Sequence, residues 1–231
     1  MAIIKDPAHM ENLFSNMTEV DRLLEIHARV TKPGRGRKHA AVQVLHKSGI
    51  VLLVACWEAF VEDLAASALR LMIDKGDRHT IFPSEVLDRV ASKYQGKNAW
   101  KLAGTGWKSA MNNHFREVLA RTTGTLNTPK TEQVDELFSK VLGIPKLSSQ
   151  WVWRGRTGSR SATEELDKLV TLRGSIAHRV QSSETVRKST VSDARGLVGR
   201  LAVKSHNAIN AYLESKIGGT PWDRYRFEGT L

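Results

Sequence analysis

Residues 39–75 read HAAVQVLHKSGIVLLVACWEAFVEDLAASALRLMIDK and indicate the fold of the chain. The apolar residues of this stretch recur every three or four positions, as in a helix, whereas a strand would alternate apolar and polar residues. They form two stripes, and apolar residues on two faces predict a helix buried between neighbouring helices. Glu58 and Glu62 lie one turn apart on the second stripe. Because an unpaired buried charge costs several kcal/mol, these carboxylates are expected to have cationic or donor partners. The rest of this stripe is Val51, Ala55, Ala65, Leu69 and Met72.

Helical spacing continues on both sides of this stretch, and no run alternates apolar and polar residues convincingly, so the chain is predicted to be all-α. Short additional helices are expected in the less regular middle section, residues 76–129. Pro33 and Gly34 mark a break before the long helix, and Gly218 and Gly219 mark the end of the last one. The expected helices cover residues 10–30, 39–75, 84–90, a segment around 107–119, 129–142, 162–179 and 191–216. Ser84 is expected to cap the third of these, and Ser161 with Glu164 to form the capping pair of the sixth. The fifth is expected to open at Thr128 and Pro129 and to close at Gly143.

Length and composition fit one globular domain. The chain has 231 residues, of which 41% are hydrophobic and 26% charged. We expect one helical domain over residues 1–220 and a basic, aromatic tail over 221–231. A formal net charge of +11 makes an anionic partner the first expectation.

The cysteine count and the apolar runs bear on the compartment. The single cysteine, Cys56, cannot form an internal disulfide and is expected to be a small core residue. The N-terminal ten residues lack the apolar region of a secretion signal, and Glu58 and Glu62 interrupt the longest apolar run. A cytoplasmic protein that does not cross a membrane is expected.

Two kinds of ligand site have little support. The histidines are scattered and there is one cysteine, so neither a zinc framework nor H-E-x-x-H is present, and no metal is expected. The segment GTGWKS, residues 104–109, has only a superficial likeness to a phosphate-binding loop, because no strand precedes it. No G-x-G-x-x-G pattern is present either, so no cofactor is expected.

The segment LDKLVTLRGSIAHR, residues 166–179, carries the most information about function. On a helix, Arg173 falls in the middle of the apolar stripe and needs a partner. A buried ion pair with Glu58 or Glu62 would explain it without any catalytic role. His178 is rotated by about 140° from Arg173 at 100° per residue, so a structural or capping role for His178 also stays open. The stripe consists of Leu166, Leu169, Val170, Ile176, Ala177 and Val180.

The sequence RGSIAH, residues 173–178, resembles the R-x4-6-H signature of HEPN domains, and its surroundings resemble the RiboL-PSP-HEPN family. Three further blocks share the resemblance: ACWEAFVEDL at 55–64, NTP at 127–129 leading to DELFSKVLGI at 135–144, and WVWRGR at 151–156. The resemblance extends over residues 49–213. It implies an all-α HEPN-type bundle that forms a homodimer.

Many members of this superfamily are metal-independent endoribonucleases. The resemblance therefore implies that Arg173 and His178 are catalytic, in a cleft shared by two subunits. An imidazole titrates near neutrality and can exchange protons with the RNA 2′-hydroxyl, while an arginine fork suits a phosphate that gains negative charge. Glu58 or Glu62 would hold Arg173. Ser175 would either add a hydroxyl near the cleft or be an ordinary surface serine.

The resemblance also suggests a toxin–antitoxin or anti-phage defence role. Two departures from the family pattern bear on this. Gly174 stands where many members have Asn, Asp or His, and Arg179 stands where a glycine often follows the histidine. Arg179 would add a phosphate contact. Gly174 favours an alternative, a catalytically silent module that binds RNA or pairs with an antitoxin of the nucleotidyltransferase type. A structural helical adaptor is a third reading.

Basic and aromatic residues outside the motif offer further RNA contacts. The loop cations are Arg35, Arg37 and Lys38 in one segment and Arg154, Arg156 and Arg160 in another. They would neutralise RNA phosphates or would simply form soluble surface. In the tail, Trp222, Tyr225 and Phe227 alternate with Arg224 and Arg226. Packing of the tail onto the bundle is favoured over stacking on bases.

Overall fold

The computed structural model describes residues 7–30, 40–123, 128–153, 162–178 and 185–226. All regular secondary structure in these ranges is helical, which confirms the predicted all-α class. The α-helices are α1 (Ala8–Val30), α2 (Ala40–Lys75), α3 (Ser84–Ala91), α4 (Gly106–Thr123), α5 (Thr131–Leu142), α6 (Ala162–His178) and α7 (Lys188–Ile217). Short 3-10 helices are η1 (His79–Ile81), η2 (Gly96–Leu102) and η3 (Leu147–Gln150).

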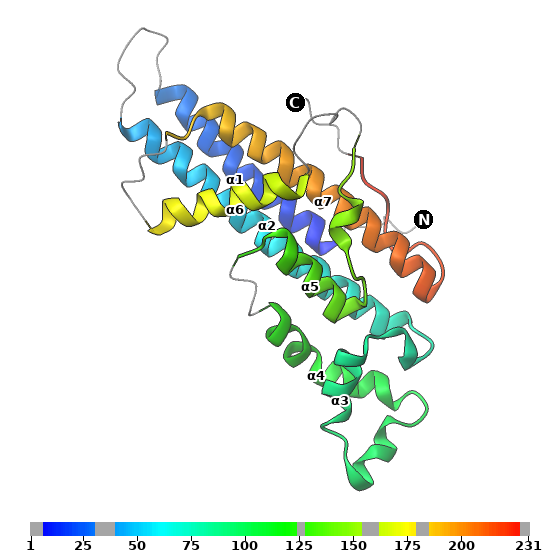
Figure 1. Ribbon diagram of the computed structural model, residues 1–231. Helices are drawn as coiled ribbons and strands as arrows, with labels where there is room; N and C mark the ends of the chain where they lie inside the picture. Colours follow the sequence, from blue (N-terminus) through cyan, green and yellow to red (C-terminus); the bar gives the residue numbers. More distant parts are fainter. Residues whose placement is uncertain (1–6, 31–39, 124–127, 154–161, 179–184, 227–231) are drawn as a thin grey trace.

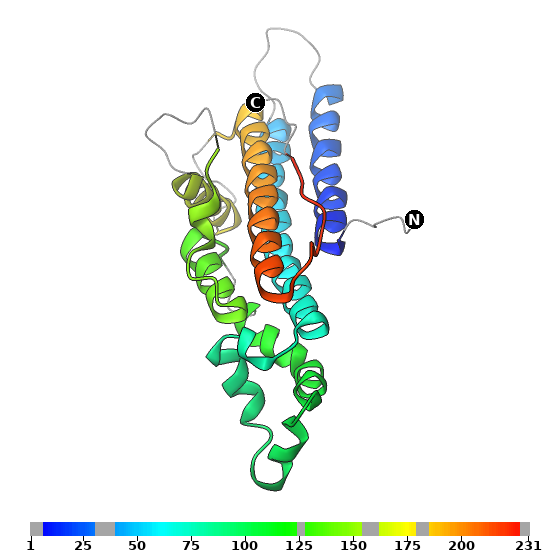
Figure 2. The ribbon, with the colours of Figure 1, turned by 90° about the vertical axis from the view of Figure 1, so that its right-hand side faces the viewer.

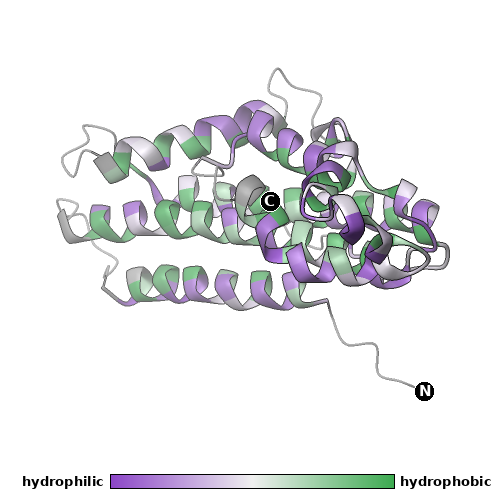
Figure 3. Cartoon of the chain, turned by 90° about the horizontal axis from the view of Figure 1, so that it is seen from below, coloured by the Kyte–Doolittle hydropathy of each residue, from purple (hydrophilic) through white to green (hydrophobic). Residues whose placement is uncertain are grey.

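Helix α2 is the centre of the molecule. It contacts α1, α4, α5, α6 and α7. Helices α1 and α7 lie along it, α6 crosses it, and α3, η2 and α4 form a lobe beyond its C-terminal end (Figures 1 and 2). Seen from below, the long helices carry hydrophobic and hydrophilic residues interspersed along their length, as expected for helices that bury part of their surface (Figure 3).

The core is built around the middle of α2. Trp57, Phe60 and Leu64 are almost completely buried. The Trp57 indole donates a hydrogen bond to the carbonyl of Pro129 at 3.0 Å, so the largest core side chain is also satisfied. Gly49 lets α7 approach closely, because a Cβ at Gly49 would lie 2.9 Å from Cγ1 of Val191. Cys56 is buried with a free thiol, as the sequence predicts.

The C-terminal segment returns along α7 and packs on it. Asn207 and Asn210 each hold this segment through two hydrogen bonds, exchanged with the backbones of Tyr225 and Trp222 respectively. The Trp222 ring stacks on the buried His206, with ring centroids 5.4 Å apart. Packing of Trp222 and Tyr225 onto the bundle is therefore confirmed, and Phe227 lies outside the described residues.

Three helix starts and one N-cap differ from the sequence prediction. Helix α5 begins at Thr131 and not at Pro129. The carbonyl of Pro129 accepts a hydrogen bond from the Trp57 indole instead of taking part in the helix. Helices α1 and α7 begin at Ala8 and Lys188, a few residues earlier than their apolar spacing indicates. Ser84 is the first residue of α3 and does not cap it, since its hydroxyl bonds to the carboxylate of Glu85 at 3.3 Å. The predicted ends at Gly143 and Gly218 are confirmed.

The sequence also overestimates how much of α2 is covered. Ala55 of the second stripe is exposed, and Leu52, another apolar residue of this helix, is 39% exposed. Periodicity alone cannot show how far the neighbouring helices extend along α2. The C-terminal half of the helix, with Ala65, Leu69 and Met72, is buried as predicted.

Among the described helices, none combines the length and the apolar character needed to cross a membrane.

Candidate active site on helices α2 and α6

Helix α6 is fixed in place by its apolar side and by a side-chain cap. Leu166, Leu169 and Val170 are buried, as the stripe predicts. The Asp167 carboxylate accepts the backbone N–H of Thr131 at 2.8 Å, at the first turn of α5. This contact satisfies an N–H that would otherwise have no partner within its helix. Further along α6 the burial decreases, and Ala177 is exposed, contrary to the prediction that it lies on the buried stripe.

Arg173 lies on the core-facing side of α6, where burial decreases. Its side chain is partly buried, and its Nε is buried without a hydrogen-bond partner among the described residues. The charge of Arg173 influences the pKa of Glu58. Burial raises the pKa of Glu58, and the positive charge of Arg173 partly opposes that rise. Within the described chain, no carboxylate oxygen lies within the 4 Å of a salt bridge to Arg173. Arg173 is therefore within electrostatic reach of Glu58 but forms no ion pair with a described residue.

Glu62 has a different environment. Its pKa is raised by burial first and then by the neighbouring charges of Glu58 and Asp63, and Arg173 is not among the causes. The prediction left Glu58 and Glu62 open as partners of Arg173. The structure brings Glu58 into electrostatic reach of Arg173, while Glu62 responds to its acidic neighbours on α2.

Ser175 does not join Arg173. Two residues along a helix are separated by about 200°, so Ser175 lies on the opposite side of α6. Its hydroxyl donates to the carbonyl of Leu172 at 2.8 Å. Of the two readings of Ser175, the ordinary helix-surface serine fits this geometry.

The remaining predicted site residues fall outside what the structure describes. His178 is the last residue of α6, and its side chain lies outside the described residues. The predicted phosphate contacts also lie outside them: Arg35, Arg37, Lys38, Arg154, Arg156, Arg160 and Arg179. Their roles stay predictions. In the described ranges, no group of three or more His, Cys, Asp or Glu residues is arranged to hold a metal ion.

Comparison with known families gives the context for this arrangement. Residues 11–211 match the family model described as RiboL-PSP-HEPN. The chain belongs to the RiboL-PSP-HEPN family. No curated protein and no solved structure matches the chain. The match confirms the family assignment that the RGSIAH segment and its companion blocks predict.

The glycine within the RiboL-PSP-HEPN motif of this chain is not required by packing. A Cβ built at Gly174 would meet no atom within 4 Å. Gly174 therefore adjoins open space next to Arg173, and a side chain is sterically allowed there. Within one subunit, the packing of the described residues therefore does not require glycine at this position.

Sequence reasoning missed a second feature of this RiboL-PSP-HEPN protein, a groove of about 410 Å³ between α6 and α7. Trp153 and Arg200 line it, and the Arg200 guanidinium lies 5.7 Å from the centre of the Trp153 ring. Its charged lining also includes Glu165, Lys168 and Asp193. An arginine among the apolar residues 197–203 was the available signal, but only the fold pairs it with a tryptophan so distant in sequence.

Proposed function

We propose that this protein is a metal-independent endoribonuclease. The 2′-hydroxyl of RNA attacks the adjacent phosphate, the bond to the 5′-oxygen breaks, and the products carry a 2′,3′-cyclic phosphate and a 5′-hydroxyl. The observation that carries the proposal is Arg173, which lies within electrostatic reach of Glu58 yet has an unpartnered Nε and no ion pair with a described residue. Family membership supports the same reading.

Each motif residue has a chemical task in this reaction. His178 exchanges a proton with the attacking 2′-hydroxyl or the leaving 5′-oxygen, since an imidazole can act as acid or base near neutrality. Arg173 orients the phosphate and stabilises its growing negative charge with its planar fork of donors. Glu58 positions Arg173 through charge attraction. Arg179 adds a phosphate contact.

A second copy of the chain completes the site in this proposal. Val44 is 63% exposed and Leu52 is 39% exposed, and together with the exposed Ala55 they form an apolar side of α2 that Glu58 borders. An exposed apolar helix face beside the candidate site favours a two-fold interface across it. Two copies would then bring two Arg173 and two His178 residues to one cleft, which removes the difficulty that the two side chains leave one helix at different angles.

A cleavage assay tests the function. Purified protein is incubated with single-stranded RNA and with DNA of the same sequence, with and without EDTA, beside Arg173→Ala and His178→Ala. We expect cleavage of RNA alone, unaffected by EDTA, ending in a 2′,3′-cyclic phosphate and abolished by either substitution. Cleavage of DNA, loss of activity in EDTA, or full activity in His178→Ala would contradict the proposal.

The absence of a polar residue at position 174 favours one other candidate, a silent module that binds RNA or an antitoxin without cutting. RNA binding without cleavage in the same assay would identify it. For the active enzyme, the proposal includes a cytoplasmic role in a toxin–antitoxin or anti-phage defence system, where an RNA-cutting protein needs a neutralising partner.

A further inference from the structure

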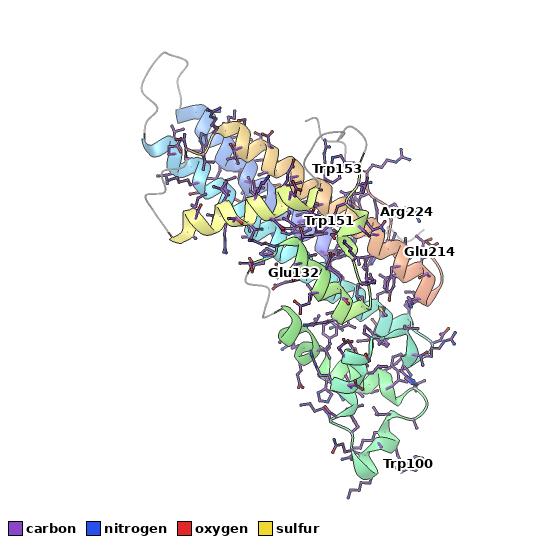
Figure 4. All side chains as sticks on the ribbon, viewed as in Figure 1. Trp100, Glu132, Trp151, Trp153, Glu214 and Arg224 are labelled. Atoms are coloured by element: carbon purple, nitrogen blue, oxygen red, sulfur yellow. The ribbon has the colours of Figure 1, made fainter. Side chains whose placement is uncertain are left out.

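The lobe beyond α2 ends in an exposed tryptophan. Trp100 lies in η2 and is 82% exposed, the largest exposed fraction among the large hydrophobic side chains described as exposed. Figure 4 places it at the far tip of the lobe, away from the bundle. A side chain of this size on the outermost turn contributes nothing to the core. Its exposure therefore indicates a binding role.

The chain around Trp100 is strongly basic. Residues 89–116 contain no Asp or Glu, and their cations are Arg89, Lys93, Lys97, Lys101, Lys108 and Arg116. Lys93 pairs with Glu117 at 2.9 Å, whereas Arg89 and Lys108 bond to uncharged backbone carbonyls. Within the described chain, Lys97 and Lys101 have no ion pair. Positive charge is thus left uncompensated on both sides of Trp100.

The backbone holds this arrangement in place. A 3-10 helix has three residues per turn, so Lys97 and Trp100 stand on one edge of η2 and Lys101 on the next. Leu102 turns inward and packs against the core. Gly96 and Gly104 bracket the turn, each with φ of +58°, a backbone conformation that a residue with a Cβ rarely adopts. The exposed indole therefore lies on a turn whose backbone is defined by two glycines and by the inward packing of Leu102.

The turn is also anchored to the rest of the lobe. Trp107, just after it, is buried and meets Phe82 edge-on with ring centroids 5.7 Å apart. Helix α4 is tied back to α2 by Arg70, whose guanidinium lies 4.2 Å from the centre of the Phe115 ring. A ligand that binds Trp100 would therefore be held by a surface fixed to the whole molecule.

We propose that η2 is a second contact site for single-stranded RNA, an inference that rests on the proposed function. One unpaired base stacks on Trp100, and the flanking phosphates are bound by Lys97 and Lys101. An aromatic platform with cations beside it suits single strands, because every base has a face to stack and every linkage has a charge. A membrane is disfavoured as the occupant, because the neighbours Gln95 and Asn98 are polar and Trp100 is the one exposed large hydrophobic residue described between residues 89 and 116.

This contact gives the enzyme a preference for longer RNA. Glu58, which marks the candidate site, and Lys75, where the lobe begins, are separated along α2 by about 25 Å at 1.5 Å per residue. An RNA long enough to reach both places gains the η2 contact. A dinucleotide that fills only the cleavage site does not.

The test uses the full chain carrying His178→Ala, so that RNA stays intact, and measures its affinity for single-stranded RNAs of increasing length over a range of salt concentrations. Trp100→Ala is expected to weaken binding of long RNA on the order of tenfold, and Trp100→Phe to keep most of it. Lys97→Ala with Lys101→Ala should lower the slope of log affinity against log salt by about 1.4. The matched control is Lys146→Ala with Lys216→Ala, which should leave the slope nearly unchanged.

The outcomes separate this inference from the proposed function. Photo-crosslinking of RNA to the peptide that contains Trp100 would support the inference whether or not the wild-type chain cuts RNA. If the wild-type chain cuts RNA while Trp100→Ala binds and crosslinks as before, the inference is wrong and the proposed function stands. If Trp100→Ala instead abolishes binding to anionic lipid vesicles or to an acidic protein and leaves RNA binding intact, η2 serves that other partner and the inference is overturned. A chain that binds no RNA overturns both.

Discussion

Among the described residues, Arg173 lacks the close carboxylate that a structural arginine would have. A structural arginine in a helix stripe would be matched by a carboxylate at hydrogen-bond distance, because breaking a buried pair costs several kcal/mol. Arg173 instead has a buried Nε without a partner among the described residues, beside a Glu58 whose pKa is raised by burial. Such a residue costs stability to keep, and this is common at functional sites.

A substitution at Arg173 should therefore separate stability from activity. Arg173→Met keeps the length and apolar packing of the side chain while removing its charge. The free energy of unfolding is expected to stay within about 1 kcal/mol of the wild type or to rise, because no buried ion pair is broken. RNA cleavage is expected to fall by a factor on the order of a hundred or more. Urea unfolding and the cleavage assay check both, and a loss of stability with retained cleavage would favour the structural adaptor.

At the scale of helices, the sequence predicts what local chemistry determines. The apolar spacing of α2 and the stop at Gly218 predict most helix bounds to within a few residues, because these signals act within one helix. The start of α5 depends on contacts with Trp57 and Asp167 from other helices, and the apolar periodicity of α5 itself does not reveal these contacts. In the site, the RGSIAH motif identifies Arg173, but only the fold distinguishes Glu58 from Glu62 as the acid within its electrostatic reach.

Two glycines in helices provide a matched test of packing. Gly49→Ala places a methyl group 2.9 Å from Val191 where α2 meets α7, and overpacking should destabilise the chain by about 1–3 kcal/mol. Gly174→Ala meets nothing within 4 Å and should stabilise α6 by about 0.5–1 kcal/mol. Urea unfolding of both variants measures the difference. Stabilisation by Gly49→Ala would show that the α2–α7 contact is looser than described, and destabilisation by Gly174→Ala would contradict the open space at that position.

The contact of α1, α7 and the C-terminal segment should be sensitive to acid. His206 Nε2 lies 2.9 Å from the carbonyl of Asp223 and donates to it, so its Nδ1 accepts from Nε2 of His9, also at 2.9 Å. The remaining Nδ1 of His9 is buried without a partner in the described chain. Burial, and next the charge of His206, lower the pKa of His9 from 6.5 to about 3. His9 therefore binds a proton less readily in the folded chain than in the unfolded chain.

The sign of the pH effect follows from this lowered pKa. Between pH 6.5 and about 3 the unfolded state binds more protons at His9, so this contribution to stability is complete above pH 6.5 and is lost as the pH falls. The slope contributed by one proton is at most about 1.4 kcal/mol per pH unit. Urea unfolding against pH should show a shallower decline for His9→Phe, which keeps a ring beside Phe60 and Trp222. Parallel curves for the two proteins would contradict the buried neutral pair.

At the scale of the whole molecule, the proposed active site needs two copies of the chain that meet across the exposed side of α2. Leu52→Glu places a charge on that side and should convert a dimer into a folded monomer with little cleavage activity, since a charge in an apolar interface is strongly unfavourable. Ile26→Glu on α1 is the matched control, because Ile26 is 45% exposed but lies on a different helix. Light scattering after size exclusion gives the mass and circular dichroism checks the helix content. A wild-type monomer, or a Leu52→Glu dimer with full activity, would contradict this interface.

The most direct test of the shared site mixes two inactive chains. Arg173→Ala and His178→Ala are each expected to be inactive, and after the subunits exchange, a mixed dimer holds one Arg173 and one His178 in its shared cleft. The mixture is expected to regain RNA cleavage with 2′,3′-cyclic phosphate ends, to a fraction of the wild-type rate. A mixture that forms mixed dimers yet stays as inactive as either parent, while the wild type cleaves, would contradict it.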